Sequence, residues 1–464
     1  MEQQQRKASI FSPQYRASTI GIILAVTTVA FEGLAITTIA PEIARQLSGI
    51  QLYGWIFSSF LLTQLLGTII IGQQINKIGV NNAYIVSHTL FITGIIIAAL
   101  ANSMGVLVIA RAFQGFGAGA IMTCAYYSIS LNYPNQLRTK ILAAFSSAYI
   151  LPSLIGPYFA GVLAEQFTWR LVFWFVLPLI AIALVLTVPT FLKLQRKAFA
   201  EREQHTNDRT KPSYRTELQA VLLTFGTALL LLGLGKIVEW QGIVLTIIGL
   251  LILIKPLQQL LPPGSLKLKR GMPSIIVSRG LYMASYIAAE SYVVLALTEL
   301  KGNSADTVGL VVAGGSITWS FAAWLQSKLD ERAEGKNRER RISIGLVCMT
   351  IGLASIVTVV NLPGNGLFLT LISQMIIGFG IGLANPTTGA IALSKAPKGA
   401  EGEVSAHLQF IDAFGPGLSI GIGGAIIAVS NFYDAGLSTG IIIALALQLT
   451  LAIISLIISF RVKN

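Results

Sequence analysis

The chain has 464 residues, of which 54% are hydrophobic and only 11% are charged. Soluble domains carry about a quarter of charged residues, so this composition excludes an ordinary soluble protein and indicates a polytopic membrane protein. The formal net charge of +13 does not indicate a nucleic-acid partner, because the Lys and Arg residues lie in short loops on alternate sides of hydrophobic runs.

The N-terminal segment 1–16 is polar and basic. It has no short apolar core followed by a small-residue cleavage site, so we expect an uncleaved tail and no signal peptide. Six runs that are long enough to cross a bilayer as helices come next. They lie at 18–40, 53–72, 83–101, 104–127, 140–163 and 170–192.

A basic stretch with seven Lys and Arg residues, 193–217, follows the sixth run. Eight further apolar runs complete the chain, at 218–235, 240–260, 273–298, 306–328, 342–361, 366–392, 404–430 and 436–460. The sequence therefore predicts an all-α integral membrane protein with fourteen transmembrane helices. We expect a six-helix half in 1–192, a cytoplasmic loop in 193–217, two extra helices with a linker in 218–272, and a second six-helix half in 273–464.

The distribution of positive charge predicts the orientation. With the N-terminus in the cytoplasm, 26 Lys and Arg residues fall in inside loops and tails, and four fall in outside loops. This is the asymmetry that orients membrane proteins. An even number of spans returns the C-terminus to the same side. We expect a multi-pass, monomeric protein of the plasma membrane, in contact with membrane lipids, with both termini in the cytoplasm.

Internal repetition indicates the architecture. The glycine-rich stretch 110–119 returns at 373–382, with Gln374 at the position of Arg111. Residues 134–161 align without gaps with 397–424, and Glu32 aligns with Glu290. Two halves that repeat in the same sense are typical of a membrane transporter, and the two extra helices form an insertion between them.

Three of these stretches resemble signatures of the major facilitator superfamily. Residues 111–117 read Arg-x-x-Gln-Gly-x-Gly, as in the helix-4 signature, and 147–161 end in Gly-Pro-Tyr-Phe-Ala-Gly, close to the helix-5 antiporter signature. Residues 31–41 resemble the helix-1 signature of the fourteen-helix drug:proton antiporters, with Glu32 in the acidic position. The resemblance covers nearly the whole chain and implies a major-facilitator fold and export by proton exchange.

One loop departs from the family pattern. Between the second and third runs the family has Gly-x-x-x-Asp-Arg-x-Gly, whereas this chain has Asn76 at the Asp position and Lys77 at the Arg position. The corresponding loop of the second half, 328–336, retains acids and bases. The departure puts the cytoplasmic charge lock of the first half in doubt and suggests that it has moved to the second half.

Charged residues inside the runs are the candidate functional groups, because they are costly in a membrane. Glu32 lies roughly 20 Å along the first run, and Arg111 lies roughly 10 Å from the outer end of the fourth, which places both at the same depth. Our hypothesis is that Glu32 binds the transported proton and that Arg111 stabilises its charged form in one state and releases it in another. The alternative is a static buried ion pair that specifies helix packing.

Other charged groups in the runs have two interpretations each. Glu290 either binds a second proton or a cationic substrate, or is an acid at the outer rim in contact with water. Asp412 serves in proton exit or substrate contact, or is a structural acid in water. We expect Arg279 to extend to the cytoplasmic surface, and His88 and His407 to be solvated at helix ends.

Residues with little bulk or without a backbone donor are expected to shape helix contacts. Gly115 and Gly119 allow a neighbouring helix to approach closely. Pro152, Gly156, Pro157 and Gly161 predict a kinked helix packed against the other half. Aromatic rings near a few acids suit a hydrophobic cation. The residues expected to line a substrate cavity are Gln114, Tyr149, Tyr286, Gln374 and Phe410.

The sequence contains no phosphate loop, metal-ligand cluster or nucleophile–histidine arrangement, and Cys124 and Cys348 both lie in apolar runs. We therefore expect that the protein is neither an enzyme nor an ATP-driven pump, and that it binds no cofactor or metal. The expected function is proton-coupled export of small hydrophobic or amphipathic compounds such as drugs, by alternating access. The alternatives are a flippase for a lipid or glycolipid, a transporter of one specific solute, and a non-transporting, receptor-like relative.

Overall fold

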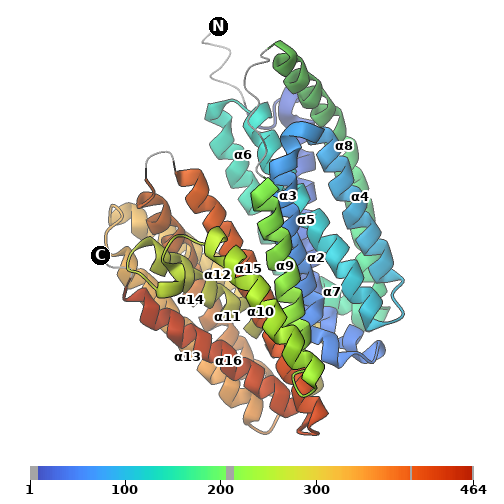
Figure 1. The fold of residues 1–464 in the computed structure, drawn as a ribbon, viewed down its shortest axis with the longest axis vertical. Coiled ribbons are helices and arrows are strands. Elements are labelled where there is room, and N and C mark those ends of the chain that lie inside the picture. The colour runs from blue at the N-terminus through green and yellow to red at the C-terminus, as the bar shows by residue number, and fades with distance from the viewer. Residues whose placement is uncertain (1–8, 205–213, 398–399, 462–464) are drawn as a thin grey trace.

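The computed structural model describes residues 9–204, 214–397 and 400–461, and every regular element in these ranges is a helix (Figure 1). Within the described ranges, fourteen spans are long and apolar enough to cross a membrane, which confirms the predicted number. The long helices are α2 (Pro13–Gln46), α3 (Tyr53–Ile78), α4 (Val80–Ala99), α5 (Met104–Asn132), α6 (Asn135–Ser147), α7 (Ile150–Gln166), α8 (Arg170–Gln204), α9 (Tyr214–Gly235), α10 (Trp240–Leu260), α11 (Met272–Glu299), α12 (Ala305–Arg332), α13 (Arg338–Asn361), α14 (Leu367–Ser394), α15 (Glu401–Phe432) and α16 (Gly436–Ser459).

The fifth span is divided into two helices, where the sequence predicts one helix over 140–163. α6 ends at Ser147 and α7 begins at Ile150. Pro152 has no N–H group with which to satisfy the carbonyl of Ala148, four residues earlier. The Thr27 hydroxyl of α2 donates to this carbonyl instead, at 3.2 Å. A side chain of a neighbouring helix thus satisfies the backbone group that the proline leaves free, as a membrane interior requires.

Much of the stretch 193–217, which the sequence predicts as a loop, is helical. α8 continues through Lys193 to Gln204, and α9 already begins at Tyr214. Leu, Gln, Lys, Arg, Ala and Glu dominate 193–204, and these residues favour helix. The remainder of the predicted loop, 205–213, lies outside the described residues, as do the tail residues 1–8 and 462–464.

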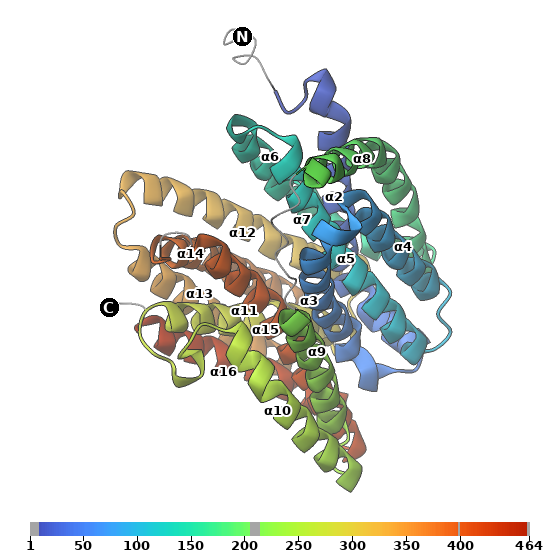
Figure 2. The same cartoon turned by 45° about the horizontal axis from the view of Figure 1, so that its top comes forward.

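The helices form two groups that contact each other along a few pairs. The first group is α2–α8 and the second is α11–α16, drawn from blue to green and from yellow to red (Figure 1). Between the groups, α3 packs against α15, α7 against α12, and α2 against α11. α9 packs against both α3 and α15, and α10 packs against α9 (Figure 2). The inserted pair therefore lies along one of the contacts between the groups.

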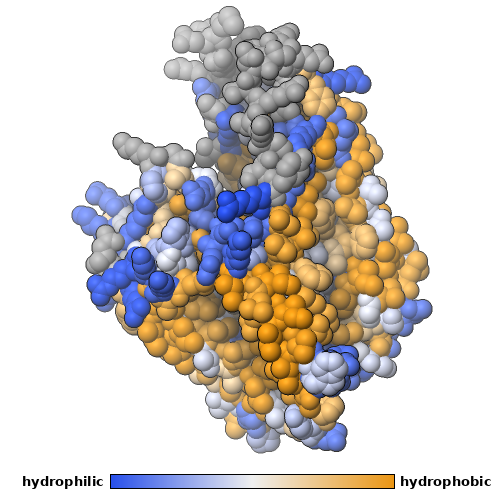
Figure 3. Space-filling view, viewed as in Figure 1, coloured by the Kyte–Doolittle hydropathy of each residue, from blue (hydrophilic) through white to orange (hydrophobic). Residues whose placement is uncertain are grey.

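We call the end of the bundle that carries Arg138, Lys328 and Arg338 the basic side, and the other end the opposite side. Figure 3 shows a broad hydrophobic surface over the spans, with many hydrophilic side chains gathered above it. Lipid can contact such a surface, as expected of a multi-pass membrane protein.

The two groups meet toward the opposite side. The Tyr53 hydroxyl, at the start of α3, donates to the Ser291 carbonyl of α11 at 2.8 Å. A methyl group on Gly54 would lie 2.9 Å from the Cα of Gly424, near the end of α15. On the basic side, α6 packs against α2, α5 and α7 of its own group. The groups are thus closed on the opposite side.

Candidate functional site

The centre of the first group is a buried ion pair between α2 and α5. Arg111 Nη1 donates to Glu32 Oε1, and the two residues are 1% and 3% exposed. The expected proximity of these two residues is confirmed. A charge in the membrane interior is tolerated when it faces protein and has an opposite charge as partner.

Neutral groups hold Arg111 as well. Its Nε donates to the Ile56 carbonyl of α3 at 3.0 Å, and its Nη1 also donates to Gln114 Oε1 at 2.8 Å. The guanidinium carbon lies 4.2 Å from the centre of the Phe60 ring, a cation–π distance. These contacts do not depend on the charge of Glu32, so Arg111 keeps partners when Glu32 is neutral.

Two polar atoms in this centre, Glu32 Oε2 and Gln114 Nε2, have no hydrogen-bond partner in the part of the chain that the structure describes. A buried polar atom without a partner is costly, and such atoms are rare in folded proteins. Here one is a carboxylate oxygen that can accept a proton. With Glu32 ionised the pair is neutral overall, and with Glu32 protonated the centre carries one positive charge.

Close contact between α5 and α3 sets this geometry. A methyl group at Gly115 would overlap the Phe60 carbonyl, and one at Gly119 would overlap the Gln64 carbonyl. The predicted close approach at these two glycines is confirmed. It brings the backbone of α3 near enough for Ile56 to accept from Arg111.

In the second group, Glu290 stands at the repeat position of Glu32, but Gln374 replaces the arginine at the position of Arg111. Glu290 on α11 is buried, and Tyr286 lies beside its carboxyl, one turn earlier. The ring of Tyr286 packs edge-on against Trp319 of α12, with centroids 5.1 Å apart. Gln374 is buried, and its Oε1 has no hydrogen-bond partner among the described residues. This region presents acceptor oxygens and aromatic rings.

The expectation that Arg279 extends to the cytoplasmic surface is wrong. Its Nε and Nη2 donate to the two carboxylate oxygens of Asp412 at 2.7 and 2.8 Å. Its Nη1 donates to the Asn385 carbonyl at 2.8 Å and to the Thr388 hydroxyl at 3.0 Å. These four hydrogen bonds satisfy the guanidinium inside the bundle, so the side chain does not need to extend to the surface.

Asp412 is therefore one half of a second ion pair, and its side chain remains 28% exposed. Glu290 and Arg279 lie eleven residues apart on α11, so this pair is about 16 Å nearer the basic side than Glu290. The role expected for Asp412 stays a prediction.

The expectation that His88 is solvated at a helix end is wrong. His88 is buried, its Nδ1 is 3.0 Å from the Tyr84 carbonyl, and its ring packs against Tyr84. His407 lies 2.9 Å from the Leu260 carbonyl through Nδ1. His88 is thus a core residue rather than a solvated one.

The residues expected to line a substrate cavity lie on four helices and at the break between α6 and α7. Gln114 and Gln374 are buried in the centres of their groups, and Phe410 is buried with its ring stacked on Phe414. Tyr149 lies at the break between α6 and α7 and is 38% exposed. That these five side chains line one substrate cavity stays a prediction.

α7 contacts the other group, as predicted. A methyl group at Gly161 would lie 2.6 Å from the Ala305 carbonyl, and one at Gly309 would lie 2.6 Å from the Pro157 carbonyl. Gly156 is less crowded, since its nearest neighbour would be Phe31 at 3.4 Å. Pro152 is buried just after the break. The contact is confirmed, and its role in gating stays a prediction.

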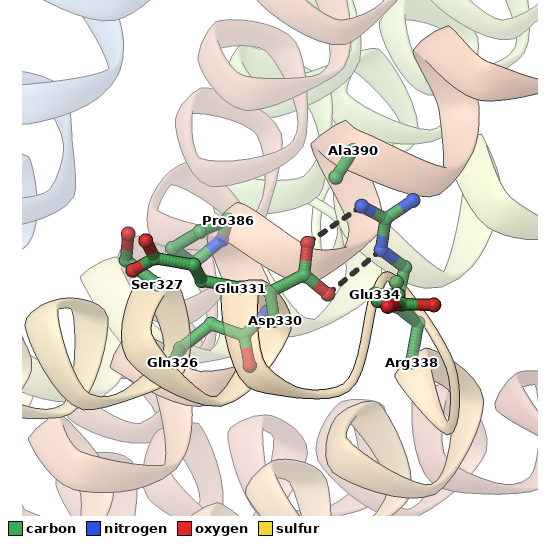
Figure 4. Close-up of a pocket in the computed structure, with 9 residues that line it drawn as sticks. Gln326, Ser327, Asp330, Glu331, Glu334, Arg338, Pro386 and Ala390 are labelled. Carbon is green, nitrogen blue, oxygen red and sulfur yellow. Dashed lines mark hydrogen bonds and ion pairs between the residues drawn. The ribbon is translucent and has the colours of Figure 1, made fainter.

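The loop 328–336 of the second group carries a cluster of ion pairs on the basic side. Asp330 accepts from Arg338 at 2.6 and 2.9 Å and also from Arg341. This cluster borders a cavity of about 630 Å³ lined by α12, α14 and the start of α13 (Figure 4). In the first group, Asn76 accepts from the Tyr127 hydroxyl at 2.7 Å.

Sequence reasoning missed Ile56, Asn385 and Thr388 as partners of the two buried arginines. Ile56 and Asn385 act through backbone carbonyls, which any residue could supply, so no side-chain pattern identifies them. Thr388 lies on α14, and it becomes a partner only when that helix packs beside the arginine.

Comparisons with known proteins agree with this architecture. The sequence model of the Major Facilitator Superfamily matches residues 20–420. The chain is 25% identical to the multidrug transporter protein MdtP of Bacillus subtilis (strain 168), over 88% of this chain and 74% of that protein. It is 30% identical to MFS transporter L2 of Phoma sp. (strain ATCC 20986 / MF5453), over 41% of this chain and only 32% of that protein.

Among solved structures, a D-xylose-proton symporter superposes with a TM-score of 0.64 and 14% identity, over 95% of this chain and 97% of that one. At this identity the likeness concerns the fold alone.

Proposed function

The chain belongs to the Major Facilitator Superfamily, and on this premise we propose that it exports small hydrophobic or amphipathic compounds in exchange for protons. The observation that carries the proposal is the centre formed by Glu32, Arg111, Gln114 and the Ile56 carbonyl. It holds a carboxyl group that can gain a proton and a cation whose other partners are neutral.

Exchange follows from the charge of this centre. Ionised Glu32 and Arg111 leave the centre neutral, so a cationic compound can approach the bundle interior. A proton on Glu32 leaves the Arg111 charge uncompensated in a medium of low dielectric constant, where it repels another cation strongly. A proton and a cationic compound therefore favour different states of the protein, and the proton gradient drives the compound outward.

The contacts between the two groups are compatible with a rocking movement of one group against the other. α3–α15 and α7–α12 have close contacts toward the opposite side, and α6, on the basic side, packs against helices of its own group. Rocking of two repeated halves about a central site is the alternating-access motion of such transporters. We assign the basic side to the cytoplasm, because Lys and Arg gather in cytoplasmic loops. The protein then works in the plasma membrane as a monomer, with both termini inside and an interior that opens inward.

The multidrug transporter MdtP, to which the chain is similar over most of its length, supports a drug-like substrate class. The amide and carboxyl oxygens of Gln374 and Glu290, together with the rings of Tyr286 and Trp319, would suit the cationic end of such a compound. We assign Glu290 and Asp412 to proton or substrate binding in the second group.

The test uses purified protein in liposomes with an imposed pH gradient and an internal pH dye. Tetraphenylphosphonium and other lipophilic cations are added, and wild type is compared with Glu32→Gln. We expect cation-dependent proton movement in wild type and none in the variant. The matched control is Glu42→Gln, which changes an acid on the same helix that pairs with the surface residue Arg45.

Full coupled transport by Glu32→Gln would contradict the proton role of Glu32. Folded wild-type protein that moves no protons with any cation would contradict export by proton exchange. That result would favour a flippase, which lipid-scrambling assays in the same liposomes would detect.

A further inference from the structure

The position of Phe60 on α3 has a counterpart in the second group. A methyl group at Gly115 of α5 would overlap the Phe60 carbonyl. In the same way, a methyl group at Gly378 of α14 would overlap the Gly315 carbonyl of α12. Since Gly115 and Gly378 occupy the same place in the repeat, Gly315 stands in the second group where Phe60 stands in the first.

A second pair of contacts gives the same register. One turn along α5, a methyl group at Gly119 would overlap the Gln64 carbonyl of α3. One turn along α14, a methyl group at Gly382 would overlap the Trp319 carbonyl of α12. Gln64 and Trp319 each lie four residues after the first contact, so the two helix pairs pack in the same way.

The side chains at the two equivalent positions differ. The Phe60 ring lies against Arg111, with the guanidinium carbon 4.2 Å from the ring centre. Gly315 faces Gln374, the counterpart of Arg111, and a methyl group at Gly315 would lie only 2.9 Å from Gln374 Cγ. A ring is therefore present beside the cation, and there is no space for one beside the neutral amide. Because the backbones pack alike in both groups, this difference follows the charge of the partner and not the helix contact.

Few charges surround Arg111. Among the described residues, Glu32 is the charged side chain that acts on it. On α4, which packs against α5, Gly94 faces Gln114, and the ring of His88 is turned to a carbonyl of its own helix. When Glu32 is protonated, the partners of Arg111 in the described part of the chain are therefore all neutral.

An aromatic ring suits this state. The face of a ring attracts a cation, and the attraction is stronger where water is excluded. Phe60 and Arg111 are 6% and 1% exposed, and the ring cannot itself bind a proton. While Glu32 is ionised, its negative charge offsets the field of the guanidinium, so the ring contributes less. Once Glu32 is neutral, the ring interacts with the full positive charge and favours the proton-bound state.

We propose that Phe60 is a positioning residue of the proton site, whose ring holds Arg111 while Glu32 is protonated and so sets the pH range of exchange. The proposal rests on the proposed proton exchange and deepens it by naming the group that stabilises the proton-bound state.

Stepwise fluorination of the ring tests this role in the full-length protein in liposomes. Fluorine withdraws electrons from the face of the ring and changes its size little. Phe60 is replaced with mono-, di- and trifluorophenylalanine, and proton flux with tetraphenylphosphonium is measured over a pH series. We expect the pH of half-maximal flux to fall with each fluorine, by up to about one pH unit in total, because the protonated state loses support.

The matched control is the same series at Phe57. This residue lies on the same helix, is also 6% exposed, and packs edge-on against Tyr53 instead of a cation. Its fluorination should leave the pH dependence unchanged. If wild type exchanges protons and the Phe60 series shows no trend, or only the trend of the Phe57 series, the role of Phe60 is wrong and proton exchange stands.

A second measurement does not depend on transport. Glu32→Gln removes the charged partner of Arg111 permanently, and Phe60→Leu removes the ring but keeps an apolar side chain. In thermal unfolding in detergent, we expect Phe60→Leu to lower the Tm more in the Glu32→Gln protein than in wild type. Equal losses in the two proteins would overturn the proposal. If wild type moves no protons, the proposed function fails, and this comparison still decides whether the ring supports an unpaired Arg111.

Discussion

Arg279 and Asp412 join α11 to α15 through two parallel hydrogen bonds of 2.7 and 2.8 Å, a fork geometry that only arginine can offer to a carboxylate. The pair is mostly buried within the second group of helices, and the Asn385 carbonyl and Thr388 hydroxyl satisfy the rest of the guanidinium. Its two members depend on each other, since either alone would leave a charge without a partner.

Removing one member should therefore cost more than removing both. We expect Asp412→Leu to lower the free energy of unfolding toward the lower end of about 3–5 kcal/mol, because the buried Arg279 charge loses its partner. The double variant Arg279→Met with Asp412→Leu should lose less than Asp412→Leu alone. Denaturant unfolding in detergent measures wild type and the two variants, and a double variant that is less stable than Asp412→Leu would contradict mutual dependence.

The amide of Gln114 should set the pH range of transport. Its Oε1 accepts from Arg111, and this bond matters most when the Glu32 carboxyl is neutral, because Arg111 then has no charged partner. In Gln114→Leu the protonated state loses this support, so a higher proton concentration is needed to reach it. We expect the pH dependence of transport to shift to lower pH, as measured by proton flux in liposomes over a pH series.

The control for Gln114→Leu is Gln114→Glu, which keeps an acceptor oxygen beside Arg111 but adds a second acid. It should move the pH dependence the other way, since a second negative charge makes protonation of the centre easier. Identical profiles for both variants and wild type would mean that Gln114 only fills space.

Two glycines of α5 offer a matched test of helix contact. A methyl group at Gly115 would overlap the Phe60 carbonyl, whereas nothing lies within 4 Å of the corresponding position at Gly105. We expect Gly115→Ala to lower the free energy of unfolding by about 1–3 kcal/mol, because α5 and α3 must move apart. Gly105→Ala should leave it unchanged. Thermal unfolding in detergent compares them, and equal stability of the two variants would contradict the contact.

The break between α6 and α7 should close when Pro152 is replaced. Pro152→Ala supplies an N–H group for the Ala148 carbonyl, which in the wild-type structure accepts from the Thr27 hydroxyl. We expect stronger protection of the backbone around 148–152 in hydrogen–deuterium exchange and slower transport, because the hinge is stiffer. Protection that stays at the wild-type value would show that the break has another cause.

The sequence could predict much of one centre. Glu32 and Arg111 are charged residues in apolar runs, and their positions along two oppositely directed helices place them at one depth. The other groups that bind Arg111 could not be predicted from the sequence. Ile56 contributes a carbonyl, and a carbonyl is present in every residue, so only the packing of α3 against α5 shows which one accepts from Arg111.

The sequence alone determined the number of spans, the repeat of the two halves and the family, because apolar length and glycine spacing are local properties that every helix displays by itself. The partner of Arg279, the break after Ser147, and the side on which the groups close were decided only by the tertiary structure. Each depends on contacts between residues more than a hundred positions apart, and no local pattern along the chain records which helices become neighbours.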